Sequence, residues 1–249
     1  MSLKINESIS MVLPVYREEA LIEDTVKMSL EKLARFTSGY EIVIVDDAGP
    51  DRTGEIADRL SREFRQVTVV HNIVNLGVGI SVLRGLMVAK GDIIFHNAAD
   101  NPFNIDDLAK ALYLLKGADV AVAVRVDRSA HSRWRKITSL VNKFLIHLLF
   151  RPQIADMNFI QVYRRKVLRD AEVSNIMSRS PAFVTPEILI RAKKKGYRIV
   201  QFGAEFHRRK AGKASYGRPH DIIWTLYDML RFRLKLLNLK FHSLAAPDD

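Results

Sequence analysis

Residues 40–53 read YEIVIVDDAGPDRT. The part from Tyr40 to Val45 is mostly apolar and β-branched, which is typical of a buried strand. The polar cluster from Asp46 to Asp51 contains a Gly-Pro pair and therefore predicts a turn. A helical pattern follows from Thr53 to Phe64. A buried strand, a tight turn and a helix in this order indicate one unit of an α/β fold.

The same alternation continues on both sides of this unit. Apolar runs predict further strands at residues 8–13, 67–70, 92–96 and 118–124. Amphipathic patterns predict helices at residues 18–36, from Gly79 to Lys90 and from Asn104 onward. Because the strands are nearly all apolar and each is followed by a helix, they favour a mainly parallel, Rossmann-like sheet with helices on both faces.

The second half of the chain is less regular. It predicts helices at residues 132–150 and 186–195, extended segments at 158–163 and 197–204, a loop at 207–218 and a basic amphipathic helix at 221–241. The sequence contains no internal repeat and no low-complexity linker. We therefore expect one main domain, residues 1–219, and a basic amphipathic C-terminal helix and tail, residues 220–249.

Composition excludes several classes of function. The 249 residues include no cysteine, which excludes disulfides, thiolate metal sites and cysteine nucleophiles. The N-terminus lacks the layout of a signal peptide, and no apolar run reaches the roughly 20 residues of a membrane span. We therefore expect a cytoplasmic protein, with a peripheral position at the cytoplasmic face of a membrane as the alternative.

The charge is divided unevenly between the two halves. Residues 1–127 hold 14 Lys or Arg and 19 Asp or Glu, a net charge of −5, whereas residues 128–249 hold 25 and 9, a net charge of +16. An acidic half is suited to a cation, and a basic half is suited to an anionic partner. We do not expect nucleic acid as that partner, because the basic residues lack interleaved stacking aromatics.

Three polar clusters follow predicted strands: residues 14–18, Asp46-Asp47 and residues 97–100. In a parallel sheet the carboxyl ends of the strands share one edge, and ligands bind beyond that edge. The three clusters therefore predict one ligand site.

Several motifs occur in a fixed order along the chain. They are VLPVYRE at residues 12–18, VDDAGPDRT at 45–53, NLGVG at 75–79, Gly91-Asp92, Arg125, Arg135, Ser139, Asp156, Glu187 ahead of Gly196, and RKAGKASY at 209–216. This series resembles the inverting GT-A glycosyltransferases of family 2, especially the branch of dolichol-phosphate-mannose synthases and bacterial polyprenyl-phosphate glycosyltransferases. The resemblance runs from about residue 8 to residue 218. It implies a GT-A fold in which residues 1–219 form the catalytic domain.

The resemblance assigns nucleotide recognition to the first two clusters. Asp46 matches the family position whose carboxylate contacts the nucleoside. The loop with Tyr16 and Glu18 matches the family loop that forms one side of the binding site for the base. For Asp51 we favour a capping role at the helix that begins near Thr53. The implied nucleotide-binding residues are Pro14, Tyr16, Glu18, Asp46, Asp47, Asn75, Gly77, Ala98 and Ala99.

The third cluster matches the Asp-X-Asp motif, in which two carboxylates hold a divalent cation against the diphosphate. Aligned through Gly91-Asp92, the motif falls on Ala98-Ala99-Asp100, so the first carboxylate is absent. The resemblance implies Mg²⁺ or Mn²⁺ with Asp100 as metal ligand, held more weakly because hard cations favour charged oxygen donors. Three interpretations stay open: weaker metal binding, an inactive form, or replacement of the metal by basic residues.

The resembled branch uses a polyprenyl phosphate as acceptor, whose oxygen is already anionic near neutral pH and needs positioning more than a general base. The resemblance implies Asp100, Arg125 and Arg209 as catalytic residues. It implies Arg135, Ser139, Arg209 and Ser215 as the residues that bind the acceptor phosphate. Family members often have Ser-Lys where Ala214-Ser215 stand.

Two hypotheses of function follow. The leading one is transfer of a sugar from a GDP- or UDP-sugar to a polyprenyl or dolichyl phosphate, or a similar acceptor, with inversion. The alternative, motivated by Ala98, is a catalytically degenerate protein of the same fold that serves as a binding or scaffold subunit.

The C-terminal helix has an apolar face with cations beside it. The face carries Ile222, Ile223, Leu226, Tyr227, Leu230, Leu234, Leu237 and Phe241, and the cations are Arg231, Arg233, Lys235 and Lys240. With the aromatic residues Trp224 and Phe232, this pattern is typical of a helix that lies on an anionic membrane surface. The alternative is a helix docked on the core or on a second copy of the chain in a homo-oligomer.

Overall fold

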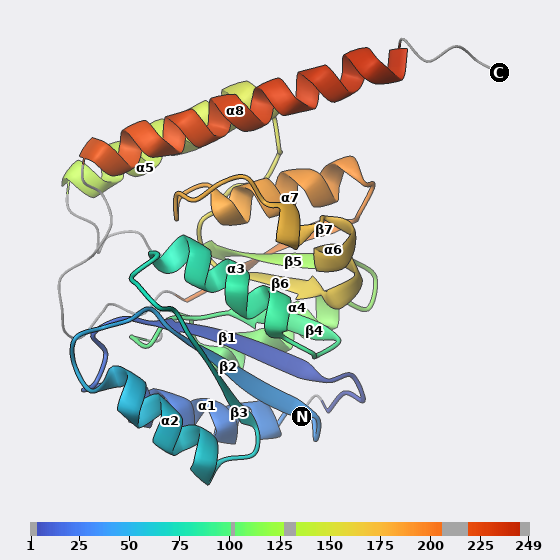
Figure 1. The fold of residues 1–249 in the computed structure, drawn as a ribbon. Coiled ribbons are helices and arrows are strands. Elements are labelled where there is room, and N and C mark those ends of the chain that lie inside the picture. The colour runs from blue at the N-terminus through green and yellow to red at the C-terminus, as the bar shows by residue number, and fades with distance from the viewer. Residues whose placement is uncertain (1–3, 101–102, 127–132, 206–218, 245–249) are drawn as a thin grey trace.

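The computed structural model describes residues 4–100, 103–126, 133–205 and 219–244 (Figure 1). Within these ranges, seven strands form one sheet in the order β3-β2-β1-β4-β6-β5-β7. The neighbouring pairs are parallel, except that β6 runs antiparallel to both β4 and β5. The expected mainly parallel sheet is confirmed. The strands are β1 (Ile9–Val15), β2 (Tyr40–Asp46), β3 (Val67–His71), β4 (Ile93–His96), β5 (Val120–Arg125), β6 (Gln161–Arg164) and β7 (Ile199–Ala204).

Helices cover both faces of this sheet (Figure 1). The helices on one face are α1 (Ile22–Ala34), α2 (Thr53–Glu63), the 3-10 helix η1 (Ile105–Asp107) and α4 (Leu108–Leu114). Those on the other face are α3 (Val78–Val88), α6 (Arg165–Asp170), the 3-10 helix η2 (Val173–Asn175) and α7 (Val184–Lys194). Two long helices, α5 (Arg133–Phe150) and α8 (Pro219–Leu244), lie side by side beyond α7 (Figure 1).

The central strand β1 explains the nearly unbroken apolar sequence of the first half. Every residue of β1 is buried. Met11 and Leu13 join the core beneath α1 and α2, whereas Val12 joins the core beneath α3 and α7. A strand with helices on both faces must be apolar at successive positions, not only at alternate ones.

The structure shifts some predicted boundaries. The helix predicted at residues 18–36 begins later, at Ile22, because the backbone of Leu21 is not helical. The Glu18 carbonyl accepts the Leu21 and Ile22 amides, both at 2.9 Å, in the turn that precedes the helix. The helical segment expected from Asn104 onward is capped by Asn104, whose side chain accepts the Asp106 amide at 3.1 Å. The short helix α6 was not predicted. The predicted loop at residues 207–218 lies outside the described residues.

Helix α8 docks on the rest of the molecule along one stripe. Met229, Phe232 and Leu236 are buried in the core that contains α3 and α7. The prediction that Phe232 faces a membrane is therefore wrong. Phe232 is 1% exposed, because it lies on the same side of the helix as the buried Met229 and Leu236. Trp224, by contrast, is 50% exposed. Among the described residues, no helix is both long and apolar enough to cross a membrane.

Helix α3 packs tightly against the centre of the sheet at Gly85. A Cβ atom at this position would lie 2.2 Å from Cγ1 of Val12 and 3.1 Å from Cγ2 of Val45. Both valines are fully buried, so neither side chain can move away without disturbing the packed core.

We expect Gly85→Ala to lower the free energy of unfolding by about 1–3 kcal/mol, because overpacking outweighs a gain in helix propensity of about 1 kcal/mol. Gly117→Ala is the matched control, since the nearest atom to its added Cβ would be Nη1 of Arg198 at 4.0 Å. Urea unfolding followed by circular dichroism measures both variants. Equal midpoints for Gly85→Ala and wild type would contradict this account of the α3 contact.

Candidate functional site

The polar clusters follow neighbouring strands and meet at one edge of the sheet. Val15, the last residue of β1, pairs with Asp46, the last residue of β2. Past the strand ends, the Asp47 amide donates to the Val15 carbonyl, and the Asn97 amide donates to the Val12 carbonyl, both at 2.9 Å. The structure thus brings the clusters together at the carboxyl edge, where α/β folds bind ligands.

Asp47 is 3% exposed and holds the loop that follows β3. Its Oδ1 accepts Nδ2 of Asn72 at 2.6 Å and the Leu76 amide at 2.9 Å, and its Oδ2 accepts the Gly77 amide at 2.9 Å. Hydrogen bonds to a charged acceptor are among the stronger ones in proteins. The carboxylate therefore fixes the loop that carries Asn75 and Gly77.

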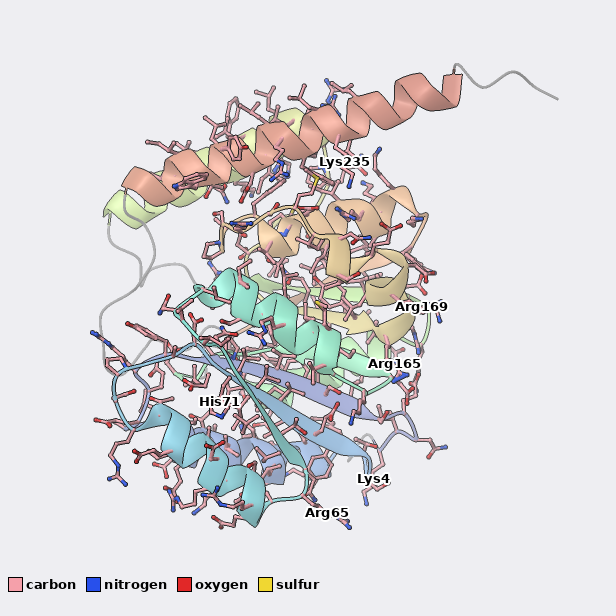
Figure 2. The ribbon with its side chains drawn as sticks, viewed as in Figure 1. Lys4, Arg65, His71, Arg165, Arg169 and Lys235 are labelled. Atoms are coloured by element: carbon pink, nitrogen blue, oxygen red, sulfur yellow. The ribbon has the colours of Figure 1, made fainter. Side chains whose placement is uncertain are left out.

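Asp46 is 7% exposed, and its two carboxylate oxygens have different surroundings. Oδ2 lies 3.0 Å from Nδ1 of His71, whose Nε2 lies 2.9 Å from Oδ1 of Asp58 on α2. Figure 2 labels His71. Oδ1 is buried and has no hydrogen-bond partner among the described residues. A buried oxygen without a donor is costly, so this atom is suited to accept an N–H or O–H group from a ligand.

The loop after β1 is tied to the start of α2. The Glu18 amide donates to Oγ1 of Thr53 at 2.9 Å. The Asp51 carboxylate accepts the Thr53 hydroxyl at 2.8 Å and the Thr53 amide at 3.4 Å, which agrees with the helix-capping role expected for Asp51. The Arg17 guanidinium lies over the Tyr16 ring, 5.3 Å from its centre. These contacts place Glu18 beside the turn that contains Asp51.

A pocket of about 210 Å³ opens at the same edge. An apolar pocket with a few polar groups is typical of a site for a small ligand. Among its lining residues, all of them within the described part of the chain, Arg125 is the one with a formal charge at pH 7. The lining consists of Pro14, Val78, Gly79, Val82, His96, Asn97, Ala98, Arg125, Asn158, Phe159, Ile160, Pro181, Val184 and Thr185.

Arg125 is anchored at the wall of this pocket. Its Nη2 donates to the Asn158 carbonyl at 3.0 Å, and its Nε lies 3.7 Å from Oδ2 of Asp156. Its guanidinium carbon lies 4.7 Å from the centre of the Phe159 ring. A planar cation held in one position is suited to bind a phosphate group.

His96 lines the pocket, and the sequence patterns did not single it out. Burial lowers the pKa of His96 to about 4, so the imidazole is neutral near pH 7. Its Nδ1 is buried and has no hydrogen-bond partner among the described residues. A lone histidine gives no motif; the signal that could have found it is its position at the end of β4, two residues before Ala98.

The turn after β4 offers one carboxylate where the motif has two. Ala98 lines the pocket, and the Ala99 carbonyl accepts the Thr25 hydroxyl at 2.6 Å. Asp100 follows and is partly exposed. Among the described residues, no group of three or more His, Cys, Asp or Glu side chains is arranged to hold a metal ion. Asp100 is the one carboxylate that Ala98-Ala99-Asp100 offers, and this turn alone is a poor fit for a divalent cation because hard cations favour several charged oxygen donors.

The structure describes no side chain of the four residues expected to bind the acceptor phosphate. Arg135 and Ser139 lie on α5, and their side chains are outside the described part of the structure. Arg209 and Ser215 lie outside the described residues altogether. Their roles stay predictions.

Comparison with known proteins identifies relatives over most of the chain. A sequence profile described as glycosyl transferase family 2 matches residues 10–171. Glycosyltransferase AglD of Haloferax volcanii is 29% identical over 90% of this chain and 36% of its own length. Dolichol-phosphate mannosyltransferase of Pyrococcus furiosus is 26% identical over 92% of this chain and 63% of its own length. The chain thus spans between about one third and two thirds of the length of these two curated relatives.

A third relative and two solved structures extend the comparison. Undecaprenyl-phosphate mannosyltransferase of Micrococcus luteus is 25% identical over 82% of this chain and 85% of its own length. Glucosyl-3-phosphoglycerate synthase from Mycobacterium tuberculosis, solved with Mn²⁺, UDP and phosphoglyceric acid, has a TM-score of 0.64 at 19% identity, over 98% of this chain and 80% of that chain. TarS from S. aureus, solved with UDP-GlcNAc, has a TM-score of 0.60 at 20% identity, over 91% of this chain and 65% of that chain. The two structures share the fold, which confirms the expected GT-A-like architecture.

The contacts of His71 make folding stability depend on pH. A hydrogen bond to Asp58 and another to Asp46 raise the pKa of His71 above its usual 6.5, against the opposing effect of burial. Because the folded state binds this proton more tightly, the resulting stability is fully present below about pH 6.5 and is lost as the pH rises through the raised pKa.

We therefore expect the free energy of unfolding to fall as the pH rises above about 6.5, and His71→Asn to remove that part of the fall. His147→Asn is the control, because this imidazole contacts the Lys143 carbonyl rather than a carboxylate. Urea unfolding across a series of pH values measures the effect. If His71→Asn keeps the wild-type pH dependence, the Asp46–His71–Asp58 contact does not contribute to it.

Proposed function

The chain belongs to glycosyl transferase family 2, and from that premise we propose that it transfers a sugar from a GDP- or UDP-sugar to a polyprenyl or dolichyl phosphate, with inversion at the anomeric carbon. The observation that carries the proposal is the pocket at the carboxyl edge, with Arg125 anchored in its wall and the buried oxygen of Asp46 at the same edge. The names of the relatives support the acceptor class, since one is a dolichol-phosphate and another an undecaprenyl-phosphate mannosyltransferase.

We propose that the nucleoside lies over the ends of β1 and β2. Oδ1 of Asp46 would accept a hydrogen bond from it, which would satisfy an oxygen that has no donor among the described residues. Asp47 acts indirectly, because it fixes the loop before α3. The other proposed nucleotide contacts are Pro14, Tyr16, Glu18, Asn75, Gly77, Ala98 and Ala99.

The proposed transfer is a direct displacement. An oxygen of the acceptor phosphate attacks the anomeric carbon, the bond from that carbon to the diphosphate oxygen breaks, and its electron pair leaves with the nucleoside diphosphate. The attacking oxygen is already anionic, so no general base is required. Arg125, Arg209 and Asp100 are the proposed catalytic residues, and Arg135, Ser139, Arg209 and Ser215 are proposed to position the acceptor phosphate.

No step of this reaction is assigned to a metal ion. The expected Mg²⁺ or Mn²⁺ would have Asp100 as its carboxylate ligand and would bind weakly, because Ala98 supplies no second carboxylate. In a Mn²⁺-dependent site the ion neutralises charge on the leaving group. Here the proposed sources of positive charge are the arginines of the site.

Ala98 also favours a second candidate function. A scaffold subunit that keeps the fold and has lost transfer needs no carboxylate at this position. The two candidates differ in one observable: the scaffold shows no turnover with any nucleotide sugar.

Helices α5 and α8, which contact each other, both carry exposed apolar residues, and we call these residues together the platform. Lys143, Arg231 and Lys235 are exposed on the same two helices, and Figure 2 shows Lys235 on α8. Contiguous apolar patches beside polar residues mark interaction surfaces. The platform residues, each at least 38% exposed, are Leu140, Val141, Phe144, Leu148, Ile223, Trp224, Leu226, Tyr227, Leu230 and Leu234.

We propose that the platform rests on an anionic membrane, where a lipid phosphate acceptor resides. The charge of +16 in residues 128–249 complements such a surface, and each nearby cation adds about 1 kcal/mol of attraction. Anionic lipids are concentrated in the cytoplasmic leaflet, so this proposal places the protein at the cytoplasmic face. A second copy of the chain in a homo-oligomer is the competing occupant of the platform.

Turnover tests the reaction. We expect the wild type to release nucleoside diphosphate from at least one of GDP-mannose, UDP-glucose and UDP-GlcNAc when a short polyprenyl phosphate is present. Arg125→Ala should lower kcat/KM by about 100-fold, because it removes a fixed cation beside developing negative charge. Arg169→Ala, a matched change at a side chain that is 78% exposed on α6, should keep the wild-type rate.

The variant Ala98→Asp separates the two candidate functions. It restores the missing carboxylate and should make donor binding respond more strongly to Mn²⁺, as calorimetry with and without the ion measures. Turnover by Ala98→Asp together with no release by the wild type would reject the enzyme in favour of the scaffold.

Vesicle sedimentation tests the platform. We expect the wild type to sediment with phosphatidylserine vesicles at low salt and to be released at high salt, because screening weakens the attraction of its cations. The double variant Leu230→Ser, Leu234→Ser should sediment several-fold less, whereas Met87→Ser, which changes an apolar side chain 57% exposed on α3, should sediment normally. Equal sedimentation of all three proteins, or a dimer that the double variant dissociates, would assign the platform to another partner.

A further inference from the structure

One wall of the pocket depends on a short segment before α7. Residues 178–181, which we call the wall segment, lie in the connection between η2 and α7. Pro181 of this segment lines the pocket together with Val184 and Thr185. The backbone carbonyl of Ser180 accepts the Phe183 amide at 2.9 Å and the Val184 amide at 3.1 Å, so the segment also sets the start of α7.

Helix α8 holds the middle of the wall segment. Asp228 is 5% exposed, and its Oδ2 accepts the Arg179 amide and the Ser180 amide, both at 2.9 Å. The hydroxyl groups of Thr225 and Ser180 lie 2.5 Å apart. Two amide donors that converge on one buried carboxylate oxygen fix the segment against α8.

On its other side, the wall segment presses on the first turn of α3. A Cβ atom at Gly79 would lie 2.9 Å from the Arg179 carbonyl oxygen and 3.2 Å from Cα of Pro181. The segment therefore has no room to move toward α3. The loop that leads into α3 is itself fixed by Asp47, so both sides of the pocket wall are defined by buried carboxylates.

The ends of the wall segment have anchors that do not involve Asp228. Glu187 of α7 is fully buried, and its Oε2 accepts the Ser178 amide at 3.0 Å. Phe183, just after the segment, packs with Phe150 of α5 and Phe232 of α8, with ring centres 5.4 to 6.1 Å apart. Loss of Asp228 would therefore release the middle of the segment and leave its ends attached.

We propose that Asp228 is a positioning residue that shapes the sugar-binding part of the pocket from the helix that carries the platform. This rests on the proposed function and adds one assignment to it: the part of the pocket beside Pro181, Val184 and Thr185 takes the sugar, whereas the ends of β1 and β2 take the nucleoside. Asp228 touches neither ligand; it acts through Arg179, Ser180 and Pro181. The outward face of α8 meets the membrane, and its inward face sets the width of the pocket.

The proposal predicts that the affinity for nucleotide sugars falls while the affinity for the free nucleotides does not. General destabilisation of the fold would lower both affinities. In the full chain, we expect Asp228→Ala to weaken binding of GDP-mannose or UDP-glucose about tenfold, equivalent to about 1.4 kcal/mol, and to leave binding of GDP or UDP unchanged. Asp228→Asn keeps a carbonyl oxygen for the two amides and should restore most of the affinity. Asp106→Ala, at a side chain 52% exposed, is the matched control and should bind like wild type.

Calorimetry with each nucleotide and each nucleotide sugar gives the result. Equal weakening of both ligand types, no weakening of either, or no rescue by Asp228→Asn would overturn the proposal.

A second measurement covers the case in which the wild type binds no nucleotide and the proposed function itself fails. Hydrogen exchange at the Arg179 and Ser180 amides should be faster in Asp228→Ala than in wild type, with exchange at Ser178 unchanged. Unchanged exchange at Arg179 and Ser180 would show that Asp228 does not hold the wall segment.

Discussion

Strand β1 pairs in parallel with β2 on one side and with β4 on the other, and this pairing brings together the polar clusters that follow the three strands. The turns after β2 and β4 are each joined to β1 by an amide–carbonyl hydrogen bond, from Asp47 and from Asn97. Strand β1 is buried throughout, and α3 presses on it at Gly85. The polar clusters at these strand ends therefore rest on the buried core, because they cannot shift without a rearrangement of the packed strands beneath them.

The sequence predicts the parts of this arrangement that burial dictates. Strands covered on both faces need nearly unbroken apolar runs, so the strands of the first half and the polar clusters that end them can be recognised. The direction of β6 cannot be recognised in the same way. A strand of four residues has the same pattern in either direction, and its antiparallel course depends on pairing with β4 and β5.

Neighbouring residues of the same type can have different roles, which a sequence does not separate. Asp46 and Asp47 are adjacent carboxylates, yet the loop before α3 occupies both oxygens of Asp47, and one oxygen of Asp46 has no donor among the described residues. The difference arises because successive residues at a strand end point to opposite sides. The sequence is likewise ambiguous for α8. Its pattern shows apolar stripes along the helix but does not show which stripe packs against the core. Buried Thr225 and Asp228 decide it, because they need the polar partners that the wall segment supplies.

Alanine at position 98 is consistent with the electrostatics of the pocket. With alanine at position 98 and a neutral His96, the lining contributes no negative charge, and Arg125 is its one cation at pH 7. Oδ2 of Asp156 lies 3.7 Å from Nε of Arg125 and partly neutralises its charge. Asp156 is not among the residues that line the pocket. A carboxylate at position 98 would repel a diphosphate unless a metal ion neutralised it, whereas a methyl group there imposes no such requirement. A pocket of this charge can attract a diphosphate through its arginine, so alanine at position 98 leaves an electrostatic basis for binding an anionic ligand.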